Sequence, residues 1–200
     1  MAQHSEMTLF DSSGQRLYLT PEERKRFAEA ATKHSITNEA RTFCRMLYYT
    51  GCRPSEALQL TSDRINFAEN SVVLRSLKKR KDANGNPRPV FRSVPLPDSF
   101  LDELNLVHNI KDAKHPVSLW PWSRATGWTR VKEVMAVADI EGVHATCKGL
   151  RHGFGVAHAM KKTALPSISK WLGHEDIKTT AIYLQVCGEE ERALAAAVWD

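Results

Sequence analysis

The sequence predicts one α+β domain that is mostly α-helical and carries a small three-stranded antiparallel sheet. Most of the chain repeats apolar residues at helical spacing, between recognisable helix starts and stops. One stretch, residues 65–94, instead alternates apolar and polar residues around Asn84-Gly85, as a β-hairpin does. The 200 residues contain no repeat, low-complexity tract or long linker, and this length suits a single good-sized domain.

The N-terminal half is divided by helix caps and glycines. Thr20 is a capping residue followed by Pro21, and Gly51 can end a helix. In order, we expect an N-terminal arm over residues 1–19 with a small hairpin around Ser13-Gly14, a helix from 20 to about 34, a second over 38–50, and a third beginning at Arg53-Pro54.

The rest of the chain contains the sheet and six helices. Pro95 and Pro97 end the last strand, Ser123 caps one helix, and Pro166 and Gly173 bound another. The expected strands are residues 65–67, 72–77 and 90–94, and the expected helices are 98–107, 123–140, one starting after Cys147, 166–173, one carrying Tyr183, and a final one over 189–199.

Composition excludes several classes of protein. Hydrophobic residues make up 42% and charged residues 26%, as in ordinary globular proteins. No apolar run is long enough to span a membrane, and no signal-peptide pattern is present, so we expect a cytoplasmic protein without a membrane partner. No histidine pair has metal-ligand spacing. The cysteines lack Cys-x-x-Cys spacing and are predicted to be reduced, mostly buried thiols: Cys44, Cys52, Cys147 and Cys187.

Positive charge is concentrated in one place. The formal net charge is +5, but residues 75–92 alone carry +6, so the rest of the chain sums to −1. We call residues 75–92 the basic segment. Such a concentration on a balanced domain indicates a nucleic-acid partner. Its predicted DNA-binding residues are Arg75, Lys79, Arg80, Lys81, Arg88 and Arg92, and Lys78 lies among them.

The stretch Lys148-Gly149-Leu150-Arg151-His152 is the strongest candidate for chemistry. On a helix, Lys148, Arg151 and His152 share one face, which we expect to point outward, opposite an apolar face of Leu150, Phe154 and Ala157. An outward row of cations is suited to hold an anion.

A second candidate stretch follows the predicted Gly173 helix stop. His174 lies just past that helix, and Tyr183 follows nine residues later. We expect the last helix to bury a stripe of Ile177, Ala181 and Leu184 and to leave Tyr183 off it. An unburied tyrosine near arginines and a histidine suggests a nucleophile that attacks phosphate. Taken alone, each of these residues is more commonly a surface or packing residue, and only their co-occurrence favours chemistry.

These motifs together resemble the catalytic domain of the tyrosine recombinase (phage integrase) family, over roughly residues 20 to 200 and in the family's order. The similar segments are the first arginine box from Thr50-Gly51-Cys52-Arg53 to Glu56 and Leu60, the hairpin with Lys78, the second arginine box Gly149-Leu150-Arg151-His152, and Leu172-Gly173-His174 through Tyr183.

The resemblance implies the DNA breaking–rejoining fold, a covalent 3′-phosphotyrosine intermediate, and no need for metal, ATP or another cofactor. It divides the chain into the arm, a catalytic domain at 20–187 and a C-terminal helix at 188–200, which either swings onto a neighbouring protomer or folds back. The implied catalytic residues are Arg53, Lys78, Lys148, Arg151, His174 and the nucleophile Tyr183, with Glu56 and His152 in support.

The chain departs from the family pattern at Lys148, where the family usually has histidine. Viral type IB topoisomerases, which are similar in active-site layout, can carry lysine there, so the substitution does not imply an inactive enzyme. Lysine near pH 7 is normally a charged hydrogen-bond donor, which fits a phosphate clamp. It could accept the tyrosine's proton only if its pKa were lowered, so both roles stay open as alternatives. Most members also have a separate N-terminal DNA-closing domain, whereas here about 20 residues precede the first helix.

We expect a site-specific recombinase that acts on double-stranded DNA as a homotetramer and is a monomer or weak dimer in solution. It would be bacterial or phage-encoded and associated with the nucleoid. Two alternatives stay open: a type IB topoisomerase-like relaxing enzyme, which Lys148 favours, and a non-cleaving DNA-binding accessory protein of the same fold.

Overall fold

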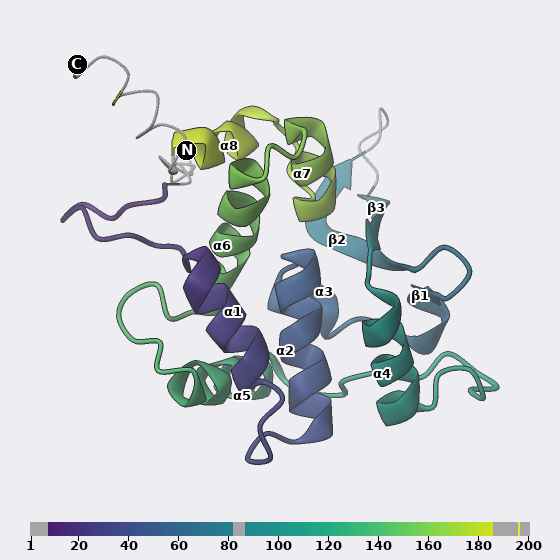
Figure 1. Ribbon diagram of the computed structural model, residues 1–200. Coiled ribbons are helices and arrows are strands. Elements are labelled where there is room, and N and C mark those ends of the chain that lie inside the picture. Colours follow the sequence, from purple (N-terminus) through teal and green to yellow (C-terminus); the bar gives the residue numbers. More distant parts are fainter. Residues whose placement is uncertain (1–7, 82–86, 186–195, 197–200) are drawn as a thin grey trace.

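The computed structural model describes residues 8–81, 87–185 and 196, and gives the backbone alone at 78–81, 87 and 88. The described residues form a mostly helical domain with a three-stranded antiparallel sheet at one side, which confirms the predicted class (Figure 1). Its elements are α1 (Pro21–Ala30), α2 (Asn38–Thr50), α3 (Pro54–Ala57), η1 (Ser62–Arg64), β1 (Ile65–Asn66), β2 (Ser71–Lys81), β3 (Pro87–Pro95), α4 (Asp98–His108), α5 (Arg124–Val137), α6 (Cys147–Met160), α7 (Leu165–Leu172), α8 (Lys178–Ala181) and η2 (Ile182–Gln185), where η marks a 3₁₀ turn.

Helix boundaries follow the predicted caps. The hydroxyl of Thr20 accepts a hydrogen bond from the Glu23 amide, and the Glu23 carboxylate accepts one from the Thr20 amide, which is a complete capping box. Ser123 caps α5 through its own hydroxyl, which accepts from the Thr126 amide. Gly51 ends α2 with a φ of 60°, a left-handed conformation that costs glycine little.

Helix α2 runs through the middle of the domain and organises the main core. It packs against α1, α4, α5 and α6, which surround it in Figure 1. Phe43, Met46 and Leu47 of α2 are buried, and the Phe43 ring meets Trp120 edge-to-face. This core fixes the Gly51 end of α2, and therefore the turn that carries Arg53. Cys44 and Cys52 lie in it as free, buried thiols, as expected.

The sheet has the order β1-β2-β3 and buries one face. Val72 and Leu74 of β2 and Arg92 and Val94 of β3 are buried, in register Val72↔Val94 and Leu74↔Arg92, whereas Arg75 is exposed. This alternation follows the two-residue period of a strand. The pairing is irregular between Ser76 and Arg80, which places Lys78 in a β-bulge.

Helix α6 differs from its predicted orientation. It contacts α1 and α2 on one side and α7 and η2 on another, so little of it faces solvent. Arg151 is 7% exposed and His152 1% exposed, as buried as Leu150 and Phe154, and Lys148 alone of the three predicted cations is exposed. The prediction of an outward cationic face was therefore wrong, because elements from other parts of the chain cover it.

The predicted burial around Tyr183 was also wrong. Tyr183 is fully buried, whereas Ile177 is 47% and Leu184 58% exposed and Ala181 is exposed. The cause is local: α8 lasts only four residues and passes into the 3₁₀ turn η2, so the phase of a regular α-helix does not hold. Tyr183 instead joins a second, smaller apolar cluster with Leu9, Phe154, Val156, Ile168 and Leu172.

The described part of the N-terminal arm lies against this second cluster. Phe10 and Arg16 form an isolated antiparallel bridge across a turn that contains Gly14, and Leu9 is buried. The Leu19 amide donates to the Gly149 carbonyl of α6 at 3.1 Å. The predicted helix at 189–199 and Cys187 fall outside the described residues, apart from residue 196. None of the helices described is long and apolar enough to cross a membrane.

Candidate active site

Arg53 projects from the turn between α2 and α3. It occupies the N-cap position of α3, and its side chain is 44% exposed. Nη1 lies 3.3 Å from Oε1 of Glu56, and the Arg53 amide donates to Oε2 of Glu56 at 3.0 Å. Because α3 has only four residues, Arg53 supplies the positive charge here mainly as a side chain, and that side chain remains open to solvent and ligand.

Arg151 is held more rigidly. Nη1 donates to the Gly51 carbonyl and Nη2 to the Leu172 carbonyl, both at 2.8 Å. The guanidinium therefore joins the end of α2 to the end of α7 and keeps further N–H donors for an anion. Burial, followed by the charge of Arg53, lowers the pKa of Arg151 to about 10, which leaves it protonated at neutral pH.

His174 follows the left-handed Gly173 at the end of α7. Its Nδ1 lies 2.8 Å from the hydroxyl of Thr180, which fixes the ring, and sequence reasoning had not singled out Thr180. Nε2 is buried and has no hydrogen-bond partner within the described part of the chain. Burial and the charges of Arg151 and Arg53 lower the pKa of His174 to about 3, so the ring is neutral at pH 7.

Tyr183 lies against His152 and His174. Its hydroxyl is 3.2 Å from Nδ1 of His152, and its ring stacks on that of His174 with a centroid separation of 6.4 Å and an interplanar angle of 18°. Gly155 makes room for it, since a Cβ at that position would lie 2.4 Å from the tyrosine ring. Burial raises the pKa of Tyr183 to about 12, and the charges of Arg151 and Arg53 oppose that rise.

Glu56 and Arg92 form a buried ion pair beside these residues. Nη2 of Arg92 is 2.6 Å from Oε2 of Glu56, and Nε of Arg92 donates to the Trp171 carbonyl at 2.7 Å. Burial favours protonation of Glu56, but the hydrogen bond and charge of Arg92 outweigh it and lower its pKa. The prediction that Arg92 contacts DNA does not fit its 7% exposure. The alternation that buries Val94 also turns Arg92 inward, a signal that the count of positive charges had overlooked.

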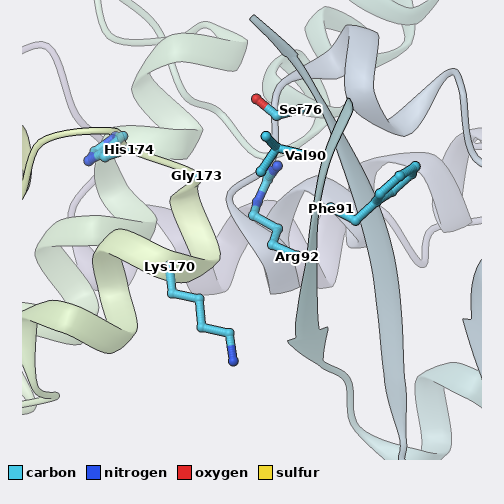
Figure 2. A pocket seen from close by; sticks show the side chains of 7 residues that line it. All are labelled: Ser76, Val90, Phe91, Arg92, Lys170, Gly173 and His174. Carbon is cyan, nitrogen blue, oxygen red and sulfur yellow. The ribbon is translucent and has the colours of Figure 1, made fainter. Parts of the chain in front are cut away.

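A pocket of about 170 Å³ lies between the β-hairpin and the end of α7 (Figure 2). Within the described residues, Ser76 contributes a buried hydroxyl without a hydrogen-bond partner. The pocket therefore has polar groups on both the sheet side and the histidine side. Its lining residues are Ser76, Val90, Phe91, Arg92, Lys170, Gly173 and His174.

The remaining predicted residues lie on the sheet and on α6. Lys78 is in the bulge of β2, where the structure gives the backbone alone. Arg75 is exposed on the same strand, and Arg80 pairs with Arg88 across the hairpin. Lys148 is exposed on α6, one turn before His152, and its charge adds to burial in lowering the pKa of that histidine.

The fold thus brings together Arg53, Arg151, His174 and Tyr183, with Glu56 and His152 in contact with them. Two guanidinium groups, two neutral imidazoles and a phenol can hold an oxyanion and present a nucleophile to it. In the part of the chain that the structure describes, no group of three or more His, Cys, Asp or Glu residues could hold a metal ion.

This fold is the predicted DNA breaking–rejoining fold, and it gathers basic residues around a tyrosine. The model of the "Phage integrase family" matches residues 17–190, so the chain belongs to that family.

Two curated relatives carry recombinase names. The tyrosine recombinase XerA of Pyrococcus furiosus is 30% identical over 179 residues, which cover 84% of this chain and 57% of the relative. A tyrosine recombinase of Thermosipho africanus is 29% identical over 168 residues, covering 77% and 53%. The chain thus spans a little over half the length of these relatives.

Solved structures show the same fold. A crystal structure of XerA recombinase has a TM-score of 0.70 at 23% identity and covers 90% of this chain and 64% of that one. A post-cleavage complex of the XerH site-specific recombinase with palindromic difH substrate has a TM-score of 0.71 at 20% identity and covers 98% and 57%. The predicted family and fold are confirmed.

Proposed function

We propose that this chain is the catalytic part of a site-specific recombinase, which cuts and rejoins duplex DNA through a 3′-phosphotyrosine at Tyr183. The observation that supports this most is the common site of Tyr183, Arg53 and Arg151. The Tyr183 hydroxyl lies 3.2 Å from Nδ1 of His152, the residue after Arg151, and Arg151 itself donates to the carbonyl of Gly51, two residues before Arg53. The names of the relatives point the same way: they are named recombinases, and one neighbour is a post-cleavage complex of a site-specific recombinase with palindromic difH substrate.

The two arginines clamp the scissile phosphate. A phosphodiester under attack gains negative charge on its non-bridging oxygens, and guanidinium groups hold such oxygens through paired hydrogen bonds. Arg151 is preset by its two backbone carbonyls, and Arg53 is open enough to close on the ligand. His174 offers Nε2 as a further donor, because Thr180 engages its Nδ1.

Lys78 protonates the leaving group. The 5′-oxygen of deoxyribose needs a proton as its bond to phosphorus breaks, and a lysine in the hairpin bulge is suited to deliver one. Lys148 acts as a third cation near the phosphate, a clamp rather than a base, since it is exposed and one turn from Arg151.

The basic segment binds the DNA backbone on both sides of the cut. Arg92 is not among the residues that contact DNA, because it is buried against Glu56. The DNA-contacting residues are Arg75, Lys79, Arg80, Lys81 and Arg88. The covalent intermediate conserves the energy of the phosphodiester bond, so the reaction needs neither metal nor ATP. Exchange between two duplexes requires four active sites, and we propose a homotetramer on DNA that works at the nucleoid, in the cytoplasm of a bacterium or phage host.

Covalent trapping tests this function. Nicked duplexes tiled across the DNA that flanks the gene are incubated with the protein in EDTA and without nucleotide, so that the short cut end diffuses away. We expect a protein–DNA adduct on a denaturing gel for one duplex sequence and not for shuffled ones. Rapid relaxation of a supercoiled plasmid without that sequence would instead identify a topoisomerase, and no adduct with any duplex would contradict the proposal.

A further inference from the structure

His152 is the imidazole that contacts the proposed nucleophile. Its Nδ1 lies 3.2 Å from the Tyr183 hydroxyl, and the two ring centroids are 6.0 Å apart. His152 is 1% exposed and Tyr183 fully buried, so bulk water does not reach the phenolic proton. Lys148, which stands where the resemblance leads us to expect a histidine, is exposed, so among these helix residues it is His152 that lies against the phenol.

Burial and neighbouring charges keep His152 neutral. Burial first, and then the charges of Lys148 and Arg151 on the same helix, lower its pKa to about 4. Tyr183 from η2 and the neutral His174 face it from the other elements. In the neutral ring, Nδ1 can accept from the phenol only if the proton is on Nε2, which is buried and has no partner among the described residues.

We infer that His152 is the group that takes the proton of Tyr183 during strand cleavage. This inference rests on the proposed function and assigns one of its steps. The phenolic O–H bond breaks with its proton passing to Nδ1, and the phenolic oxygen forms a bond to phosphorus. The bond from phosphorus to the 5′-oxygen breaks, and that oxygen takes a proton from Lys78. On rejoining, each proton returns along the same path.

Transfer before DNA binds is strongly uphill, because the pKa of the phenol is about 12 and that of His152 about 4. A phosphate bound at Arg151 adds negative charge next to the imidazole, which favours its protonated form. The attack on phosphorus then consumes the phenolate as it forms. In the free enzyme Tyr183 therefore stays protonated, and proton transfer to His152 depends on bound DNA.

The test is His152→Asn on the nicked duplex that gives an adduct with the wild type. The asparagine carbonyl can accept the hydrogen bond that Nδ1 accepts, but it does not take up a proton near neutral pH. We expect adduct formation at pH 7 to slow by about 10²–10⁴-fold. The rate of the variant should then rise with pH, whereas wild type should lose activity only on the acid side as His152 becomes protonated.

A second substitution separates proton transfer from positioning. Replacing Tyr183 by a ring-fluorinated tyrosine, which has a more acidic phenol, should restore much of the rate in His152→Asn. If His152 only positions the ring, His152→Asn keeps the wild-type rate and pH profile, and this overturns the inference. Failure of the fluorinated ring to rescue a slow, folded variant that binds the duplex normally also overturns it. Both results leave the adduct at Tyr183, and thus the proposed function, intact, whereas a wild type without an adduct removes both.

Discussion

Arg92 and Glu56 form a buried ion pair that links the sheet to the turn carrying Arg53. Oε2 of Glu56 accepts a hydrogen bond from Nη2 of Arg92 at 2.6 Å and another from the Arg53 amide at 3.0 Å. Nε of Arg92 also donates a hydrogen bond to the carbonyl of Trp171, two residues before Gly173. One guanidinium thus connects the strand paired with β2, the first arginine turn and the helix end that precedes His174.

Removal of Arg92 should destabilise the fold. Arg92→Ala leaves the carboxylate of Glu56 buried without its main partner, which costs about 3–5 kcal/mol of unfolding free energy. Arg75→Ala is the matched control, because Arg75 is exposed on the neighbouring strand and should change stability by less than about 0.5 kcal/mol. Urea denaturation measures both. Equal, small decreases would show that the pair does not hold the sheet against α3 and α7.

The two clamp arginines should differ in what their removal costs. Arg53→Ala should slow adduct formation by about 10²–10³-fold and leave stability nearly unchanged, since its side chain is half exposed. Arg151→Ala should slow the reaction similarly and also lower stability by about 1–3 kcal/mol for each buried carbonyl left without its donor. Single-turnover cleavage and denaturation curves together check this. A destabilised Arg53→Ala with a normal rate would reverse the assignment.

Lys78→Ala should be slow on ordinary DNA and recover with a sulfur atom in the 5′-bridging position, because a thiolate leaves without a proton. Lys79→Ala on the same strand is compared with the wild type at saturating protein, where weaker DNA binding does not limit the rate, and should then cleave at nearly the wild-type rate. For each variant, the measurement is the ratio of the cleavage rate on the 5′-sulfur substrate to the rate on ordinary DNA. Recovery in Lys79→Ala in place of Lys78→Ala would move the acid one residue along the bulge.

Neutralising Lys79, Arg80 and Lys81 together should weaken binding to every DNA sequence alike. The slope of log affinity against log salt should shrink by about 0.9 for each DNA phosphate that the variant no longer neutralises. Fluorescence anisotropy across a salt series measures that slope for the triple variant and for Lys111→Ala, a lysine outside the basic segment, over the Phe67 ring. An unchanged slope in the triple variant would remove the basic segment from the DNA interface.

Much of the fold could be predicted because it depends on local signals. The capping box at Thr20, the proline start and glycine stop of α7, and the alternation in β2 each act within a few residues. The boxes around Arg53 and Tyr183 likewise identified residues that the fold brings together. Such signals depend only on neighbouring residues, so they can be read from the sequence.

The wrong predictions concern residues whose burial or partner is set by segments far away in the sequence. Arg151 and His152 look like an outward cationic face until α7 and η2 cover them, and Tyr183 turns inward because a 3₁₀ turn changes the helical phase. The partner of His152 is 31 residues away and that of Arg92 is 36 residues away. A helical periodicity or a charge count carries no information about such pairs.

The identity of the residue bonded to DNA tests the central proposal most directly. The trapped adduct is digested with protease and nuclease, and the nucleotide-bearing peptide is sequenced by mass spectrometry. We expect a 3′-phosphate on Tyr183, no adduct with Tyr183→Phe, and a normal adduct with Tyr49→Phe, a tyrosine of α2 outside the site. A nucleotide on any other residue, or an undiminished adduct with Tyr183→Phe, would contradict the assignment of the nucleophile.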